Sequence, residues 1–159
     1  MSPQIDYRKE SPRGVAALHQ LESYLKDCGL ESSLLELVKT RASQINGCAY
    51  CLDMHTKDAR RAGESEQRLY ALSAWRETPF FSERERAALA FAEAVTRIAE
   101  RGAGEILEEE LRREFSEKEI VDLTFAVVAI NAWNRLAIAF QTPVGSYQPT
   151  GAAKSVAHD

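Results

Sequence analysis

The sequence predicts an all-α protein built as a single compact helical domain, and three observations carry this prediction. Apolar residues recur at intervals of three and four along most of the chain and hardly anywhere alternate in steps of two. Only 8 Gly and 5 Pro occur, too few turn formers for a sandwich or barrel of many short strands. The length of 159 residues is close to that of one domain, so we expect residues 1–159 to form one unit, with a helical body at about 12–142 and a loose tail at 143–159.

Four helices are predicted in the first half of the chain. They cover, in order, about 18–28, 34–45, 48–63 and 69–77. Gly29 and Gly47 stand at natural C-cap positions of the first two helices. Pro79 ends the fourth, because the residue before a proline avoids the helical region.

Three further helices are predicted in the second half, which makes about six to seven in all. They cover about 83–99, a short acidic stretch near 107–115, and about 117–141. Ser82 with Glu85, and Ser116 with Glu119, have the spacing of capping boxes, so each pair marks a helix start. The break between the first two of these helices is expected at Gly102 and Gly104.

The last predicted helix is apolar over residues 121–140, which is long enough to span a bilayer. A membrane span would have to satisfy Asp122, Asn131, Asn134 and Arg135, which all fall inside this window. We therefore expect no membrane span but a helix central to the core or buried in a subunit interface. The two asparagines and the arginine are expected to make structural hydrogen bonds between helices.

The charge balance and the cysteine count exclude several classes of protein. There are 20 Lys and Arg against 24 Asp and Glu, a formal charge of −4, so no basic stripe is available for nucleic acid. Three cysteines cannot form a complete disulfide framework, and no signal peptide opens the chain, so a cytoplasmic protein is expected. Cys28 ends the apolar stripe of its helix and is predicted to be a small buried hydrophobe.

The most informative residues are two cysteines and a histidine, Cys48, Cys51 and His55. Side chains at these spacings share one face of a helix, and they lean toward its N-terminus, which tips the His55 imidazole toward Cys51. Cys48 lies in the first turn, where unpaired N–H groups and the helix dipole favour an anion. Both effects favour the reactive thiolate, so the pattern predicts redox chemistry.

Metal binding, haem attachment and a purely structural role are alternatives to redox chemistry for the same three residues. A structural zinc site needs a fourth ligand, for which Cys28, Glu36, Asp53 or the distant His19 or His158 would have to serve, whereas a catalytic metal could be held by three ligands on one helix face. Attachment of a c-type haem needs histidine directly after the second cysteine, where Leu52 stands, and a thioredoxin fold needs a βαβ pattern. Two inert core cysteines beside a satisfied histidine are a further possibility.

A glutamate twelve residues before the first cysteine completes a more specific pattern. Glu36 with Cys48-x-x-Cys51-x-x-x-His55 resembles the core motif of the alkylhydroperoxidase AhpD-like proteins of the carboxymuconolactone decarboxylase superfamily, in their peroxidase-related branch. The resemblance covers about 15–142. Three further segments share it: Trp75-Arg76-Glu77-Thr78, Phe81-Ser82-x-Arg84-Glu85-Arg86-Ala87 and Ile130-Asn131-x-Trp133-Asn134-Arg135.

The resemblance implies an all-α fold assembled as homo-oligomers, trimers or hexamers, and a thiol-based reduction of hydroperoxides. It implies that Cys51 attacks the peroxide, that Cys48 resolves the product to a disulfide, and that Glu36 and His55 relay the proton. An external dithiol would be the electron donor, with no metal, flavin or haem required. Tyr50 stands where some members have a histidine, and its hydroxyl could donate a hydrogen bond.

Two questions remain open from the residues alone. The helix dipole favours Cys48 as the thiolate, whereas the resemblance favours Cys51, so the order of the pair is not decided by sequence. Two other classes of function are also compatible with the chain: a carboxymuconolactone decarboxylase-like acid–base enzyme, and a non-catalytic redox or metal-binding protein.

Overall fold

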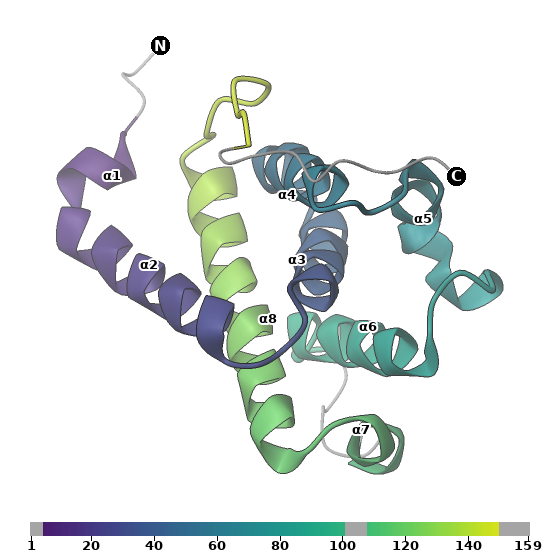
Figure 1. Ribbon diagram of the computed structural model, residues 1–159. Helices are drawn as coiled ribbons and strands as arrows, with labels where there is room; N and C mark the ends of the chain where they lie inside the picture. The colour runs from purple at the N-terminus through teal and green to yellow at the C-terminus, as the bar shows by residue number, and fades with distance from the viewer. Residues whose placement is uncertain (1–4, 101–107, 150–159) are drawn as a thin grey trace.

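The computed structural model describes residues 5–100 and 108–149, and within these ranges every regular element is helical (Figure 1). The elements are α1 (Tyr7–Glu10), α2 (Pro12–Asp27), α3 (Ser32–Asn46), α4 (Ala49–Arg61), α5 (Glu66–Ala71), the 3₁₀ helix η1 (Leu72–Glu77), α6 (Glu83–Thr96), α7 (Glu108–Glu114) and α8 (Glu117–Ala139). The predicted all-α class is confirmed.

The seven predicted helices correspond to α2 through α8, with two differences. The fourth predicted helix is divided into α5 and η1, and Ala74 within η1 leaves helical geometry at φ −118° and ψ 30°. The short helix α1 lies before the predicted helical body. Its single turn is capped by Asp6, whose carboxylate accepts the backbone N–H of Arg8, and it is held to the body by the buried ring of Tyr7.

The helix boundaries follow the local signals in the sequence. Gly47 takes the left-handed conformation at φ 69°, which allows the chain to leave α3 and turn directly into α4. Both predicted capping boxes are present, at Ser82 with Glu85 and at Ser116 with Glu119. Gly102 and Gly104 lie outside the described residues.

The core is arranged around α3 and α8. In Figure 1, α8 runs between α2 on one side and α3, α4 and α6 on the other, and it packs against all four. The largest apolar cluster joins α2, α3, α6, α7 and α8, and a second one joins α3, η1 and α6. A third, smaller cluster contains Ala42, Cys48, Cys51, Ile130 and Ala137, so the cysteine pair is built into the contact between α3, α4 and α8.

Helix α8 is long and apolar enough, by length and composition, to cross a membrane. Its packing, however, is that of a core helix, since 44% of its most apolar 18-residue window is buried inside the molecule. The prediction of a central helix is thus confirmed for its buried face. Its other face remains exposed and carries Val121, Phe125 and Val128.

The described part of the C-terminal tail, 143–149, is not helical, but it is held against α4 rather than loose. The hydroxyl of Tyr147 donates to both carboxylate oxygens of Asp58, at 2.8 and 2.9 Å. The ammonium group of Lys57 donates to the backbone carbonyl of Tyr147 at 3.0 Å. The remainder of the predicted tail, 150–159, lies outside the described residues.

Candidate active site

Cys48 occupies the N-cap of α4, one position before the first helical turn in which it was expected. Its backbone is extended, with φ −83° and ψ 94°, and its sulfur accepts the backbone N–H of Cys51 at 3.3 Å. Its own N–H donates to the carbonyl of Ser43 at 3.0 Å. A sulfur at an N-cap lies beside the unpaired N–H groups of the first turn, which stabilise negative charge there.

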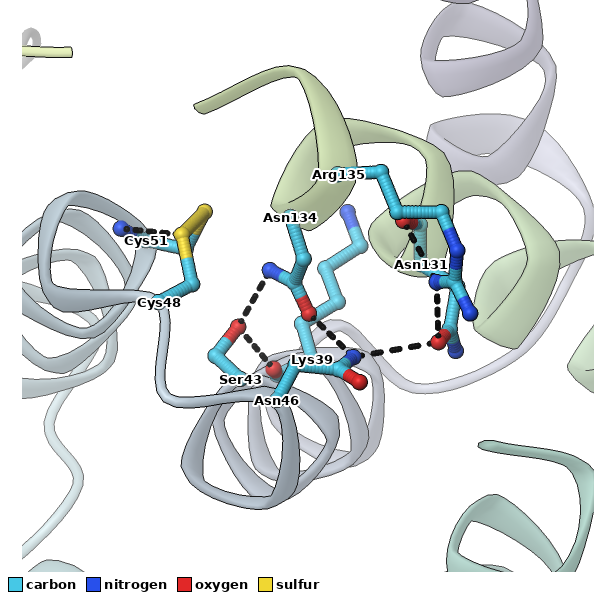
Figure 2. The surroundings of a disulfide bond; sticks show 8 residues. All are labelled: Lys39, Ser43, Asn46, Cys48, Cys51, Asn131, Asn134 and Arg135. Carbon is cyan, nitrogen blue, oxygen red and sulfur yellow. Dashed lines mark hydrogen bonds between the residues drawn. A yellow bond between two sulfur atoms is a disulfide. The ribbon is translucent and has the colours of Figure 1, made fainter. Parts of the chain in front are cut away.

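The structure joins Cys48 and Cys51 in a disulfide, with a Cα–Cα distance of 5.3 Å (Figure 2). Both residues are 1% exposed. Cys28, in contrast, is a free, half-buried thiol that packs against the main core, where its sulfur donates to the carbonyl of Leu25. The three cysteines therefore divide as predicted into a pair and a residue of the core.

His55 lies one helical turn after Cys51, with its imidazole bound to a glutamate from the neighbouring helix. Its Nδ1 is 2.9 Å from Oε2 of Glu36. His55 is 5% exposed, and the Glu36 side chain is 20% exposed. A carboxylate that binds one ring nitrogen orients the imidazole and selects the tautomer in which Nε2 can accept a proton. The structure thus brings Glu36 to the site, as the resemblance implied.

A network of amides fixes the end of α3, directly before the cysteine motif. The side-chain amide of Asn46 donates to Oδ1 of Asn131 at 3.0 Å and to Oδ1 of Asn134 at 2.8 Å, and Asn134 in turn donates to Ser43 at 3.0 Å. Figure 2 shows this network beside the disulfide, between α3 and α8. The expected hydrogen bonds of Asn131 and Asn134 between helices are confirmed. The expectation for Arg135 is wrong, because Arg135 donates to Asn131 of its own helix α8.

The surroundings of the disulfide are mainly apolar. Ile130 and Ala137 of α8 form one cluster with it, and Trp133 and the half-buried Tyr50 pack against that cluster. The guanidinium of Arg8 lies 5.7 Å from the centre of the Tyr50 ring, so α1 reaches the same end of α4. An apolar setting disfavours an isolated thiolate.

Two site residues were missed by the sequence analysis, Asp58 and Tyr147. One carboxylate oxygen of Asp58 lies within 4.8 Å of an oxygen of Glu36 and a ring nitrogen of His55. Asp58 could have been found from its spacing, since it follows His55 by three positions and shares its helix face. Nothing in the sequence marks Tyr147, which reaches Asp58 across 89 residues of chain.

The groups that could hold a metal ion differ from those considered in the sequence analysis. Among residues 5–100 and 108–149, the three side chains suited to a cation are Glu36, His55 and Asp58, with no cysteine. Asp53, one candidate fourth ligand of a zinc site, is instead paired with Lys57 at 2.8 Å. Cys48 and Cys51 are joined to each other in the disulfide and are not part of this set of possible metal ligands, and His158 lies outside the described residues.

A cavity of about 240 Å³ adjoins the outer end of the His55–Glu36 pair. Glu36 lines it together with Ala59 and Ala62 of α4 and Arg68 of α5. Arg68 forms part of its wall and is bound to two carboxylates, at 2.9 Å to Glu64 and at 2.5 Å to Glu85.

Comparison with known proteins identifies the family and the fold of the chain. Residues 10–94 match the carboxymuconolactone decarboxylase family. The chain is 42% identical over 139 residues to the uncharacterized protein YdfG of Bacillus subtilis (strain 168), across 87% of this chain and 95% of YdfG. The crystal structure of ATU0492 from Agrobacterium tumefaciens, a protein of unknown function whose description suggests an antioxidant defence protein AhpD, aligns with a TM-score of 0.86 and 47% identity, over 91% of this chain and 99% of that one. The debrominase Bmp8, at 23% identity, shares the fold with a TM-score of 0.76 over 87% of this chain and 74% of its own.

Proposed function

The chain belongs to the carboxymuconolactone decarboxylase family and has the AhpD-like fold, and from this we propose that it is a thiol-dependent alkylhydroperoxidase, an oxidoreductase of peroxiredoxin type with an antioxidant role. The observation that carries the proposal is the disulfide-forming pair Cys48 and Cys51 one turn before His55, with Glu36 bound to the imidazole at 2.9 Å. A lactone decarboxylase needs no such pair.

In the first step, His55 accepts the proton of the Cys51 thiol through Nε2 while Glu36 holds the opposite ring nitrogen. The thiolate attacks the distal oxygen of the hydroperoxide, so that a sulfur–oxygen bond forms as the oxygen–oxygen bond breaks. The leaving alkoxide takes a proton from the imidazolium and departs as an alcohol. Cys51 is now a sulfenic acid, two electrons more oxidised than the thiol.

In the second step, the sulfur of Cys48 attacks the sulfenic sulfur of Cys51, and water leaves as the disulfide forms. The Cα–Cα distance of 5.3 Å suits this bond without movement of the helix. An external dithiol then returns two electrons and two protons by thiol–disulfide exchange, and becomes a disulfide itself. The position of Cys51, one turn from the imidazole, favours it as the attacking thiol and Cys48 as the resolving one.

The partners follow from this chemistry. The substrate is a hydroperoxide, the electron donor is a dithiol, and the reaction requires no resident metal, flavin or haem. The proposed protein works in the cytoplasm and binds neither nucleic acid nor a membrane. Assembly into a homo-oligomer, a trimer or hexamer, is supported by the exposed apolar stripe of α8, Val121, Phe125 and Val128, beside Tyr24 of α2. Light scattering in solution measures the number of subunits, and a monomer at micromolar concentration would contradict this part of the proposal.

The test is peroxide consumption supplied with a dithiol, of the lipoamide type in one series and of the thioredoxin type in another. We expect Cys51→Ser and Cys48→Ser to abolish turnover, and Cys28→Ser, the matched cysteine control outside the pair, to retain it. Turnover that survives Cys51→Ser would refute the proposal. A lactone decarboxylase activity independent of both cysteines would indicate the acid–base enzyme, and stoichiometric zinc by elemental analysis would indicate the metal-binding protein.

Thiol titration provides an independent test of the redox pair. The oxidised protein should show one free thiol per chain, Cys28, and the reduced protein three. One equivalent of peroxide should then remove two thiols and leave Cys28. A loss of Cys28 with the pair retained would be incompatible with the proposed cycle.

A further inference from the structure

The C-terminal segment 143–149 is hydrogen-bonded to α4 through Tyr147. Val144, Gly145 and Ser146 are exposed, whereas Tyr147 turns inward and is half-buried. Its hydroxyl donates to both oxygens of Asp58, at 2.8 and 2.9 Å, and its carbonyl accepts from Lys57 at 3.0 Å. Two independent contacts thus hold this tyrosine at one place on the active-site helix.

The surroundings of the Tyr147 hydroxyl keep it protonated. Burial, the hydrogen bond to Asp58 and the negative charges of Asp58 and Glu36 all raise the pKa of Tyr147 above its ordinary value. The hydroxyl is therefore a permanent donor at neutral pH, and Asp58 is its acceptor. Tyr147 is placed near the His55–Glu36 pair by Asp58, the carboxylate to which its hydroxyl donates and which lies within 4.8 Å of both residues.

Asp58 is placed where it could compete with Glu36. It follows His55 by three positions on α4, and its carboxylate lies within 4.8 Å of both His55 and Glu36. The Nδ1–H of His55 can be given to only one carboxylate at a time in a short linear bond. An Asp58 carboxylate without a donor of its own would turn toward this N–H or repel the charge of Glu36.

We propose that Tyr147 is a positioning residue for the proton relay: by donating its hydroxyl to Asp58, it leaves Glu36 as the carboxylate that orients His55. The inference rests on the proposed peroxidase function and adds to it a residue from the far end of the chain. The C-terminal segment 143–149 thereby has a role in the candidate site, because Tyr147 supplies the hydroxyl group that donates to Asp58.

The test is a double-mutant cycle on Tyr147 and Asp58. Tyr147→Phe removes only the hydroxyl, and Asp58→Asn removes the charge that would compete with Glu36. The matched control is Tyr70→Phe, because Tyr70 also donates to a carboxylate, Glu66 at 3.2 Å, but lies 76% exposed on α5. The measured quantity is the rate constant for reaction of the pre-reduced protein with tert-butyl hydroperoxide in a single turnover.

We expect Tyr147→Phe to slow this reaction about tenfold, less than the roughly 10²–10⁴-fold that a general base contributes, because the base is misoriented and not removed. The same change made in the Asp58→Asn background should slow the reaction less than about threefold, since no competing carboxylate remains. Tyr70→Phe should react at the wild-type rate. An unchanged rate for Tyr147→Phe, or an equal slowing in both backgrounds, would overturn the proposal.

A second readout separates this inference from the proposed function. The imidazole ¹⁵N spectrum of His55, assigned with His55→Asn, reports how its two nitrogens are bonded whether or not the protein consumes peroxide. It should change in Tyr147→Phe and return toward the wild-type pattern in the double variant. A wild-type protein inactive toward peroxide would refute the proposed function, whereas an unchanged His55 spectrum in Tyr147→Phe would refute the positioning role.

Discussion

Replacement of Asn134 by leucine tests whether the amide network between α3 and α8 supports the active-site turn. Asn134 is fully buried, accepts the Asn46 amide at 2.8 Å and donates to the Ser43 hydroxyl at 3.0 Å. Leucine is similar in size and offers neither contact. The substitution therefore removes two hydrogen bonds from the end of α3, two residues before Cys48, with little change in packing volume.

The expected loss in the free energy of unfolding depends on the hydrogen bonds that Asn46 and Ser43 keep after the substitution. A hydrogen bond of this kind contributes about 0.5–1.5 kcal/mol net, so two of them contribute about 1–3 kcal/mol. Asn46 keeps Asn131 as an acceptor at 3.0 Å, and Ser43 still donates to the carbonyl of Lys39 at 2.8 Å, so neither partner is left wholly unsatisfied. We therefore expect Asn134→Leu to lower the free energy of unfolding by about 2 kcal/mol, near the middle of this range.

Urea unfolding of the oxidised protein at neutral pH measures this difference. Ile138→Met, on the same helix but at an exposed position outside the amide network, is the matched control and should change stability by less than about 0.5 kcal/mol. If Asn134→Leu also remained within about 0.5 kcal/mol of wild type, the network would contribute no net stability, and our explanation of how α8 holds the end of α3 would be wrong.

The remaining predictions concern the helix boundaries and the core. Gly47→Ala should cost about 1 kcal/mol in urea unfolding, because Gly47 has φ 69° before the cysteine motif; equal stability would show that the turn relaxes. Leu37→Ala should cost about 2–5 kcal/mol, since Leu37 is completely buried, and a smaller loss would mean that the site collapses around the cavity. Hydrogen bonds from the Ser116 N–H, from Arg84 and from the Ser116 hydroxyl lower the pKa of Glu119 to about 2. Its contribution to stability is present above its ordinary carboxyl pKa of 4.5 and is lost as the pH falls toward 2, so Glu119→Gln should lose less stability between pH 6 and pH 3 than wild type does; parallel losses would contradict this assignment.

Much of the fold could be predicted because its signals are local. The capping boxes at Ser82 and Ser116 each act within four residues, and Gly47 ends its helix through its own backbone conformation. The helix α1 was missed because a single turn has no periodicity to detect. It depends on a cap at Asp6 and on the ring of Tyr7, whose partner Phe140 lies 5.5 Å away at the other end of the chain.

In the candidate site, too, the alignment of residues within one helix could be predicted, whereas contacts between helices could not. Cys48, Cys51 and His55 could be aligned from their spacing, because one helix places them along a common side. Glu36 was found only through the family resemblance, since its distance of 2.9 Å from His55 depends on how α3 packs against α4. Asp58 could have been found by the same spacing argument, but its partner Tyr147 could not, because the two residues are 89 positions apart in the chain.

By itself, the sequence determined the helical class, the positions of most helices and the alignment of the two cysteines with His55, because each depends on contacts within a few residues of chain. The tertiary structure alone decided that α1 packs on the end of α8, that Asn134 of α8 holds the end of α3, and that Tyr147 binds Asp58. Such contacts join residues that are far apart in the chain, and their partners are selected by the packing of the whole helical body and not by any local pattern.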